Sequence, residues 1–236
     1  MVTERDWSIV EWVGRLGAAS APHVMARFGC GRSQTYHRLS VLVRAGLLEP
    51  RYLLRGQPTL YVATREGLSW AQLARLEPCR VSAANATHWA VCASVAVLLE
   101  REEPGYRVWS ERELRAAELD AGRPLASAEL GRLPDGRPRL RRADLILVPH
   151  DEDRHRPVAV EVELAVKGAR RLEAICRAWA RCRLVESVRY YASPAAARAV
   201  GRAVDRVHAE GVVEIYSLEE TLKGAADVRG SARAVA

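Results

Sequence analysis

The sequence predicts an α/β (α+β) protein in which helices and a small hairpin precede a mixed β-sheet flanked by helices. The first third combines apolar patterns of helical period with two short alternating runs. Residues 105–222 then follow the order α–β–β–α–β–α–β. A chain of 236 residues can hold one large or two small domains. We expect a domain at 1–77, a connecting helix at 78–104, a second domain at 105–222 and a disordered tail at 223–236.

The charge of the chain favours a polyanionic partner. The formal net charge is +7, and residues 1–80 hold 11 arginines against 6 acids. An excess of arginine of this kind is typical of proteins that bind nucleic acid. No apolar run approaches the ~20 residues of a membrane span, and the first residues do not resemble a signal peptide. We therefore expect a cytoplasmic protein without membrane contact.

The first domain has the pattern of three helices and a hairpin. Helices are predicted at 4–17, with Trp7 on the apolar side, and at 21–29. A third helix is predicted to be capped by Ser33 and to end at Gly46. The runs LLEPRYLL and TLYVAT alternate as strands around a basic turn. This order is that of a winged helix-turn-helix domain, which places its third helix in the major groove of DNA.

The stretch from Val41 to Gly67 resembles the last two elements of many bacterial winged helices. Polar residues of the third helix are then candidates for base contacts, and arginines of the hairpin are candidates for phosphate contacts. The candidate DNA-binding residues are Arg32, Ser33, Gln34, Thr35, His37, Arg38, Arg51 and Arg55. Because winged helices also bind proteins, a purely protein-binding role stays open.

The middle of the chain supplies few functional residues. A long apolar helix is predicted within residues 81–102, and Ser110 with Glu113 forms a capping box for the next helix. Glu111 in the first turn is either a partner of the helix dipole or a functional acid. The segment 126–140 is rich in glycine and proline, and Asp135 within it fits a turn residue.

Acidic residues lie on two apolar strand-like runs. Asp144 precedes LILVP, and Glu161 and Glu163 lie within VAVEVEL. Residues two apart on a strand point to the same face, so the two glutamates project together. Carboxylates on an apolar strand are costly unless a cation compensates them, and Mg²⁺ prefers such oxygen ligands. The pattern indicates a metal-dependent phosphodiesterase site.

Lysine is rare in this chain and occurs only at Lys167 and Lys223. Lys167 follows the paired glutamates directly, where an ammonium group would stabilise the negative charge that develops on a phosphate. The alternative is a solvated residue at the turn before Gly168. A helix follows, with Arg170, Arg171 and Arg177 on a basic face. Its inward side is expected to consist of Leu172, Ile175, Cys176 and Trp179.

These acids and their order resemble the PD-(D/E)XK nuclease superfamily over residues 105–220. Ala143-Asp144 matches the PD element, and Glu161-Val-Glu163 matches the (D/E)XK element, although alanine replaces proline and glutamate replaces lysine. The resemblance implies that Asp144 and Glu161 bind Mg²⁺ or Mn²⁺ with help from Glu111. It also implies roles for Glu163 and Lys167 in catalysis. The whole chain resembles the replication-relaxation family, which implies plasmid or mobile-element DNA handling.

Three functions are compatible with these residues. The first is a Mg²⁺-dependent DNA endonuclease or nickase that acts on double-stranded DNA. The second is a non-catalytic DNA-binding accessory or regulatory protein that retains the nuclease-like domain for assembly with other proteins. The third is a structural ion-pair network in which Arg141, Arg142 and Arg170 neutralise the acids, which predicts no metal affinity. A homodimer is left open.

Overall fold

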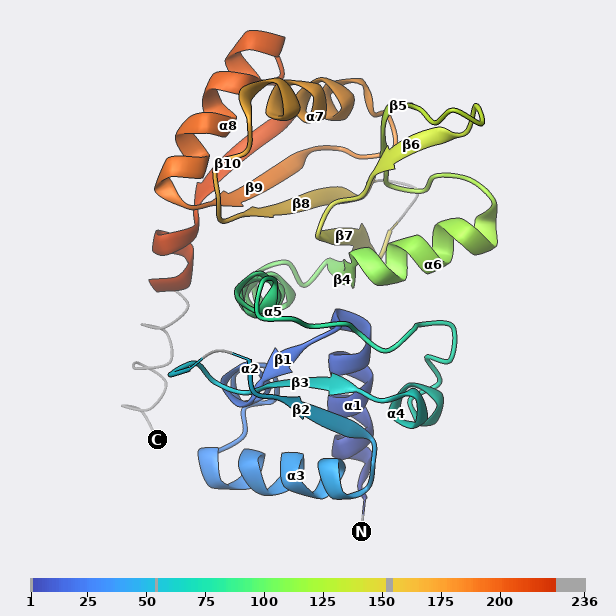
Figure 1. Ribbon diagram of the computed structural model, residues 1–236, viewed down its shortest axis with the longest axis vertical. Coiled ribbons are helices and arrows are strands. Elements are labelled where there is room, and N and C mark those ends of the chain that lie inside the picture. The colour runs from blue at the N-terminus through green and yellow to red at the C-terminus, as the bar shows by residue number, and fades with distance from the viewer. Residues whose placement is uncertain (1, 54, 152–154, 224–236) are drawn as a thin grey trace. The chain divides into compact units, whose positions relative to one another are not determined.

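The computed structural model describes residues 2–53, 55–151 and 155–223, and the expected disordered tail lies almost entirely outside them. The chain divides into two compact units, Met1–Arg101 and Glu102–Ala236 (Figure 1). The expected connecting helix belongs almost wholly to unit 1. Within the described residues, no helix is both long enough and apolar enough to cross a membrane.

Unit 1 combines helices with a small antiparallel sheet. Its elements are α1 (Glu4–Leu16), β1 (Ala19–Ser20), α2 (Ala21–Phe28), α3 (Arg32–Arg44), β2 (Leu48–Arg51), β3 (Leu60–Ala63), α4 (Arg65–Trp70) and α5 (Ala86–Glu102). The strand order is β1-β3-β2, and both pairings are antiparallel. The three expected helices and the hairpin are confirmed, whereas β1 and α4 were not expected.

Local sequence explains where the helices of unit 1 begin and end. Thr3 and Asp6 form a capping box at the start of α1, and Gly17 ends this helix with a φ of 107°. The expectation for Trp7 was wrong, because this side chain is 36% exposed. The expected cap of α3 was also wrong. Gly31 is the N-cap, and Ser33 lies inside the first turn.

Unit 2 contains a five-stranded mixed sheet. Its elements are β4 (Tyr106–Ser110), α6 (Glu111–Ala121), β5 (Ala128–Arg132), β6 (Pro138–Arg141), β7 (Leu145–Pro149), β8 (Val158–Glu163), α7 (Ala169–Arg181), β9 (Val188–Ala192), α8 (Pro194–Val207) and β10 (Val213–Ser217). The strand order is β10-β9-β8-β7-β4. Strands β8, β9 and β10 are parallel, and β7 runs antiparallel to both β8 and β4.

Helices α7 and α8 lie together over the sheet of unit 2 (Figure 1). The expected inward side of α7 is confirmed, since Leu172, Ile175, Cys176 and Trp179 are all buried. These side chains share one core cluster with Ala159 of β8 and with residues of β7, β9 and α8. Ala159, Glu161 and Glu163 are two residues apart on β8, so their side chains share one face of the strand. Because Ala159 packs with α7 in the core cluster, the two glutamates lie on the face of the sheet that α7 covers.

The expectation for residues 126–140 was incomplete. This segment forms a β-hairpin, in which β5 pairs with β6 across the turn that contains Asp135. The expected turn role of Asp135 is confirmed, because its side chain accepts hydrogen bonds from the backbone and the guanidinium of Arg137. Strand β4, which precedes the capping box of Ser110, was also not expected.

Two glycines within helices should respond oppositely to alanine. A Cβ at Gly67 would overlap the carbonyl oxygen of Leu47, whereas the nearest atom to a Cβ at Gly201 is Ile215 Cδ1 at 3.8 Å. We expect Gly67→Ala to lower the free energy of unfolding by about 1–3 kcal/mol. Gly201→Ala should raise it by roughly 0.5–1 kcal/mol. Urea unfolding measures both, and equal stabilities would contradict this packing of α4.

Candidate functional sites

The structure brings three of the predicted acids to one end of strand β7. Glu111 is the first residue of α6, and its N–H donates to the carbonyl of Asp144 at 3.0 Å. The Asp144 side chain in turn accepts from the N–H of Val162 on β8 at 2.8 Å. Glu161 is the neighbour of Val162 in that strand. The backbones of the segments that carry the three acids are therefore adjacent, whereas the Glu111 carboxylate itself pairs with Arg115.

Glu161 is held by two donors within unit 2. Its side chain is 2% exposed. Arg141 Nε donates to Glu161 Oε1 at 2.8 Å, and Arg141 Nη2 donates to Oε2. The indole N–H of Trp179, from α7, also donates to Oε1 at 3.2 Å. Both carboxylate oxygens of Glu161 thus accept hydrogen bonds from the protein. Its ion pair with Arg141 is bidentate, which is the stronger geometry for an arginine–carboxylate pair.

The charges around Glu161 are strongly coupled. Burial, followed by the charge of Asp144, raises the pKa of Glu161, while Arg141 and Lys167 oppose this rise. Burial lowers the pKa of Arg141, but Glu161 and Asp144 together raise it above its ordinary value. Burial and the Glu161 charge also raise the pKa of the Cys176 thiol to about 11, so this thiol is protonated at neutral pH.

The other predicted catalytic residues also have partners. Glu163 is buried, and its carboxylate accepts from the ammonium group of Lys167. Lys167 is therefore paired with an acid and is not a freely solvated residue. The Glu111 carboxylate is half-exposed and pairs with Arg115 at 2.5 Å.

A second buried ion pair was not expected from the sequence. Glu118 of α6 accepts from Arg142 Nε at 2.8 Å and from Ser127 Oγ at 2.6 Å. The sequence offered one signal, since Glu118 lies four residues after Leu114 on the inward side of α6. Of the three arginines expected to neutralise the predicted site acids, Arg141 does so, whereas Arg142 pairs with Glu118. Arg170 is exposed and has no acidic partner among the described residues.

The carboxylates of Glu161 and Glu163 have the chemistry of Mg²⁺ ligands. Their oxygens are hard donors of the kind that this ion prefers. However, N–H groups of Arg141 and Trp179 occupy both oxygens of Glu161, and Lys167 pairs with Glu163. A divalent cation at Glu161 would lie against a guanidinium. This arrangement does not fit a bound metal ion.

In unit 1, one side of α3 is open to solvent. Arg32, Ser33, Gln34 and His37 are exposed in its first two turns, while Leu39 is buried on the opposite side. On the hairpin between β2 and β3, Arg55 is exposed, and Arg51 is half-buried and pairs with Glu49 at 2.8 Å. These residues form the exposed part of the expected DNA-binding set.

Thr35 and Arg38 do not belong to the exposed part. Thr35 is 1% exposed, and its hydroxyl donates to the carbonyl of Gly31 at 3.0 Å. Arg38 Nε donates to Asp6 Oδ1 at 2.8 Å, and Asp6 is fully buried in α1. The sequence assigned both residues to DNA contact. In the structure Thr35 bonds within its own helix, and Arg38 attaches α3 to α1.

Two tyrosines on unit 1 were missed by the sequence analysis. Tyr36 of α3 is 45% exposed, and Tyr52 of the hairpin is 80% exposed. The guanidinium of Arg32 lies 5.8 Å from the ring centroid of Tyr36, which is within the range of a cation–π contact. The sequence signal that could have identified them is the presence of large aromatic residues among the polar positions of this helix and hairpin.

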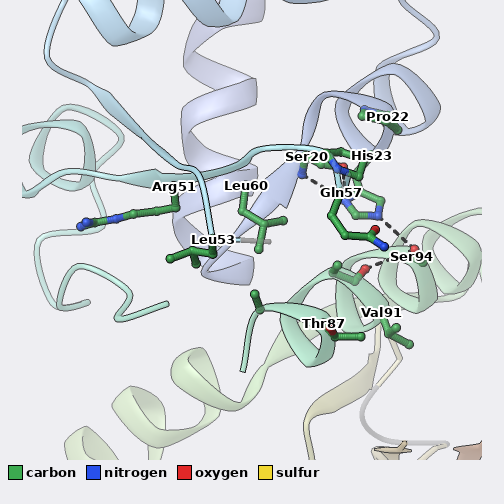
Figure 2. Close-up of a pocket in the computed structure, with 13 residues that line it drawn as sticks. Ser20, Pro22, His23, Arg51, Leu53, Gln57, Leu60, Thr87, Val91 and Ser94 are labelled. Carbon is green, nitrogen blue, oxygen red and sulfur yellow. Dashed lines mark hydrogen bonds between the residues drawn. The ribbon is translucent and has the colours of Figure 1, made fainter. Parts of the chain in front are cut away.

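A pocket of about 270 Å³ lies in unit 1 between α2, the hairpin and α5 (Figure 2). The backbone N–H of Ser20 donates to His23 Nδ1 at 3.0 Å, and His23 Nε2 lies 3.0 Å from Ser94 Oγ. The proton of the imidazole is therefore on Nε2, and both nitrogens have partners. Among the described lining residues none is acidic. His23 thus links α2 to α5 and does not form a catalytic triad.

Comparison of the chain with protein-family models, with curated proteins and with solved structures found no match.

The Arg141–Glu161 pair should dominate the stability of unit 2. Removing one partner leaves a buried charge, so Arg141→Met and Glu161→Met should each cost about 3–5 kcal/mol. The double variant should be more stable than the sum of these losses predicts, as measured by a urea-unfolding cycle. The exposed pair Glu111–Arg115 is the matched control, with an expected coupling of about 0.3–0.5 kcal/mol. Additive losses at Arg141 and Glu161 would contradict this role.

Proposed function

We propose that the protein binds double-stranded DNA through a winged helix in unit 1. The observation that carries this proposal is the open side of α3, which presents Arg32, Gln34 and His37 to solvent while Leu39 is buried behind them. The order of α1, α2, α3 and the β2–β3 hairpin is that of a winged helix.

The chemistry of this surface suits a duplex. Arginine and glutamine near the start of a groove-bound helix can donate to base edges. Arg55 at the tip of the hairpin, and Arg51 beside it, can contact phosphates. Tyr36 and Tyr52 add exposed aromatic surface to the same two elements.

We further propose that unit 2 is a PD-(D/E)XK-like domain with a non-catalytic, accessory role. Arg141 and Trp179 occupy both oxygens of Glu161, the acid to which the resemblance assigns a metal. The domain would then serve assembly with other DNA-processing proteins. Action in the cytoplasm on plasmid or mobile-element DNA belongs to this proposal, and its support is the resemblance of the motifs to the replication-relaxation family.

The second candidate function is a Mg²⁺- or Mn²⁺-dependent endonuclease. One observation favours it: Glu111, Asp144 and β8 meet, and the charge of Asp144 raises the pKa of Glu161. Carboxylates that repel one another in this way are stabilised when they share a cation. This candidate requires Arg141 to leave Glu161.

Loss of the basic side chains on unit 1 should weaken DNA binding. Arg32→Ala and Arg55→Ala should each lower the affinity for a duplex. Each should also reduce the dependence of log K on log salt by about 1, the effect of one lost phosphate contact. Fluorescence anisotropy over a series of salt concentrations measures both effects.

The matched control for this experiment is Arg65→Ala. Arg65 is an exposed arginine of unit 1 that pairs with Glu77 and lies in α4 rather than α3 or the hairpin. Its loss should leave the affinity within about twofold. Equal effects of all three substitutions would argue against a specific DNA-binding surface on α3.

Cleavage of supercoiled plasmid separates the two roles of unit 2. Because Arg141 holds Glu161, we expect the wild-type chain with Mg²⁺ or Mn²⁺ to nick no more plasmid than the Asp144→Asn and Glu161→Gln variants do. For the same reason, adding Mg²⁺ should not raise the melting temperature of the protein. Nicking by the wild-type chain that disappears in both variants would instead establish the endonuclease.

A further inference from the structure

Arginine is concentrated in two segments of unit 2 that the function proposed for unit 1 does not use. Residues 122–142 and 168–184 together hold eleven arginines and three acidic residues. Their net charge of +8 exceeds the +7 of the whole chain. Arg141 and Arg142 pair with Glu161 and Glu118 outside the segments, which leaves +6 on 38 residues against +5 on residues 1–80. Positive charge is therefore denser in these segments than in the first third.

The second segment forms α7 and the turn after it. Arg170, Arg177 and Arg181 recur at intervals of seven and four residues, so they lie on one stripe of the helix. This stripe is opposite to Trp179, whose indole contacts Glu161 on the buried side. All three arginines are exposed and lack an acidic partner among the described residues. The stripe is thus separate from the carboxylate cluster.

The first segment forms the β5–β6 hairpin, which packs against α7 (Figure 1). Arg132, Arg137 and Arg139 are exposed on it. Arg137 pairs with Asp135 at 2.7 Å, whereas Arg139 has no acidic partner among the residues that the structure describes. The hairpin therefore adds unpaired positive charge beside that of the helix.

A groove of about 630 Å³ lies between the hairpin and the end of α7. Its walls are polar and apolar in about equal parts, with Leu130 and Leu140 from the hairpin and Leu184 from the turn after α7. Glu129 of β5 is the acid among its described lining residues. Arg181 and Arg183 also line it. The leucines and the two arginines suit a chain of sugars and phosphates, since sugars present apolar surface and phosphates accept from guanidinium groups.

We infer that this hairpin–helix surface, made of Arg139, Arg177, Arg181 and Arg183, is a second nucleic-acid-binding surface that contacts the phosphate backbone of DNA. The arginines form an extended array. Along α7 the spacing is about 6 Å between Arg177 and Arg181 and about 10 Å between Arg170 and Arg177, from the rise per residue. Such spacing fits a repeating polyanion, whose charges recur every few ångströms, better than one small anion.

The inference goes beyond the DNA-binding role proposed for unit 1 and does not require it. Contacts of this kind carry no base sequence information, so the surface would increase affinity for any duplex. A chain with two such surfaces would contact more DNA than α3 and its hairpin can reach alone.

The test uses the full chain with the exposed substitutions Arg139→Gln and Arg181→Gln combined. Binding to a duplex of random sequence is measured by anisotropy over a salt series. We expect weaker binding and a salt dependence reduced by about 2, one unit for each lost phosphate contact. The control is Arg198→Gln with Arg202→Gln on α8, two exposed arginines whose loss changes the net charge equally. This control should bind as the wild type does.

The two double substitutions, Arg139→Gln/Arg181→Gln and Arg198→Gln/Arg202→Gln, are also introduced into the Arg32→Ala/Arg55→Ala variant. Residual DNA binding there that disappears with Arg139→Gln/Arg181→Gln supports two independent surfaces. If the hairpin–helix variant lowers the affinity while the unit 1 variant does not, the inference stands and the function proposed for unit 1 fails. Wild-type affinity and salt dependence of Arg139→Gln/Arg181→Gln in both backgrounds would overturn the inference, leaving an acidic protein as the partner to test.

Discussion

Glu161 carries its carboxylate into the interior of unit 2, where an uncompensated charge would cost several kcal/mol. The compensation comes from two other elements, Arg141 at the end of the β5–β6 hairpin and Trp179 in α7. Strand, hairpin and helix therefore meet at one carboxylate. Arg142, the next residue, reaches Glu118 in α6. Consecutive arginines thus attach the hairpin to both the sheet and α6.

In unit 1 a buried acid is likewise neutralised by an arginine. Asp6 is fully buried in α1, and Arg38 of α3 neutralises it. In both units the arginines divide into those that pair with a buried acid and those that lie in solvent. Arg38 fixes the orientation of α3, while Arg32 lies on its open side. An arginine-rich sequence alone does not reveal this division, because the acid partner is 20 to 32 residues away in the two pairs.

Much of the fold could be predicted because its signals are local. The cap at Ser110 and the apolar side of α7 depend on neighbouring residues. Strand β4 and the β5–β6 hairpin were missed. The short β4 lacked a clear alternating pattern, and glycines and prolines hide the pairing of the hairpin. For the site, alternation correctly gave Glu161 and Glu163 a common face. It could not show that α7 covers this face, because that contact joins residues far apart in the chain.

The ion pair also determines what the endonuclease candidate would need. Arg141 keeps its proton because Glu161 and Asp144 raise its pKa, so no ordinary pH separates the pair by deprotonation. A cation bound at Glu161 would leave the guanidinium of Arg141 without its partner in a largely buried place. Metal binding and the ion pair therefore exclude one another, and metal binding must compensate the loss of the pair. Since Arg141 ends β6, releasing it would remove one of the contacts that attach the hairpin to the sheet. Any catalytic state of unit 2 would therefore differ from the present one at the Arg141–Glu161 pair.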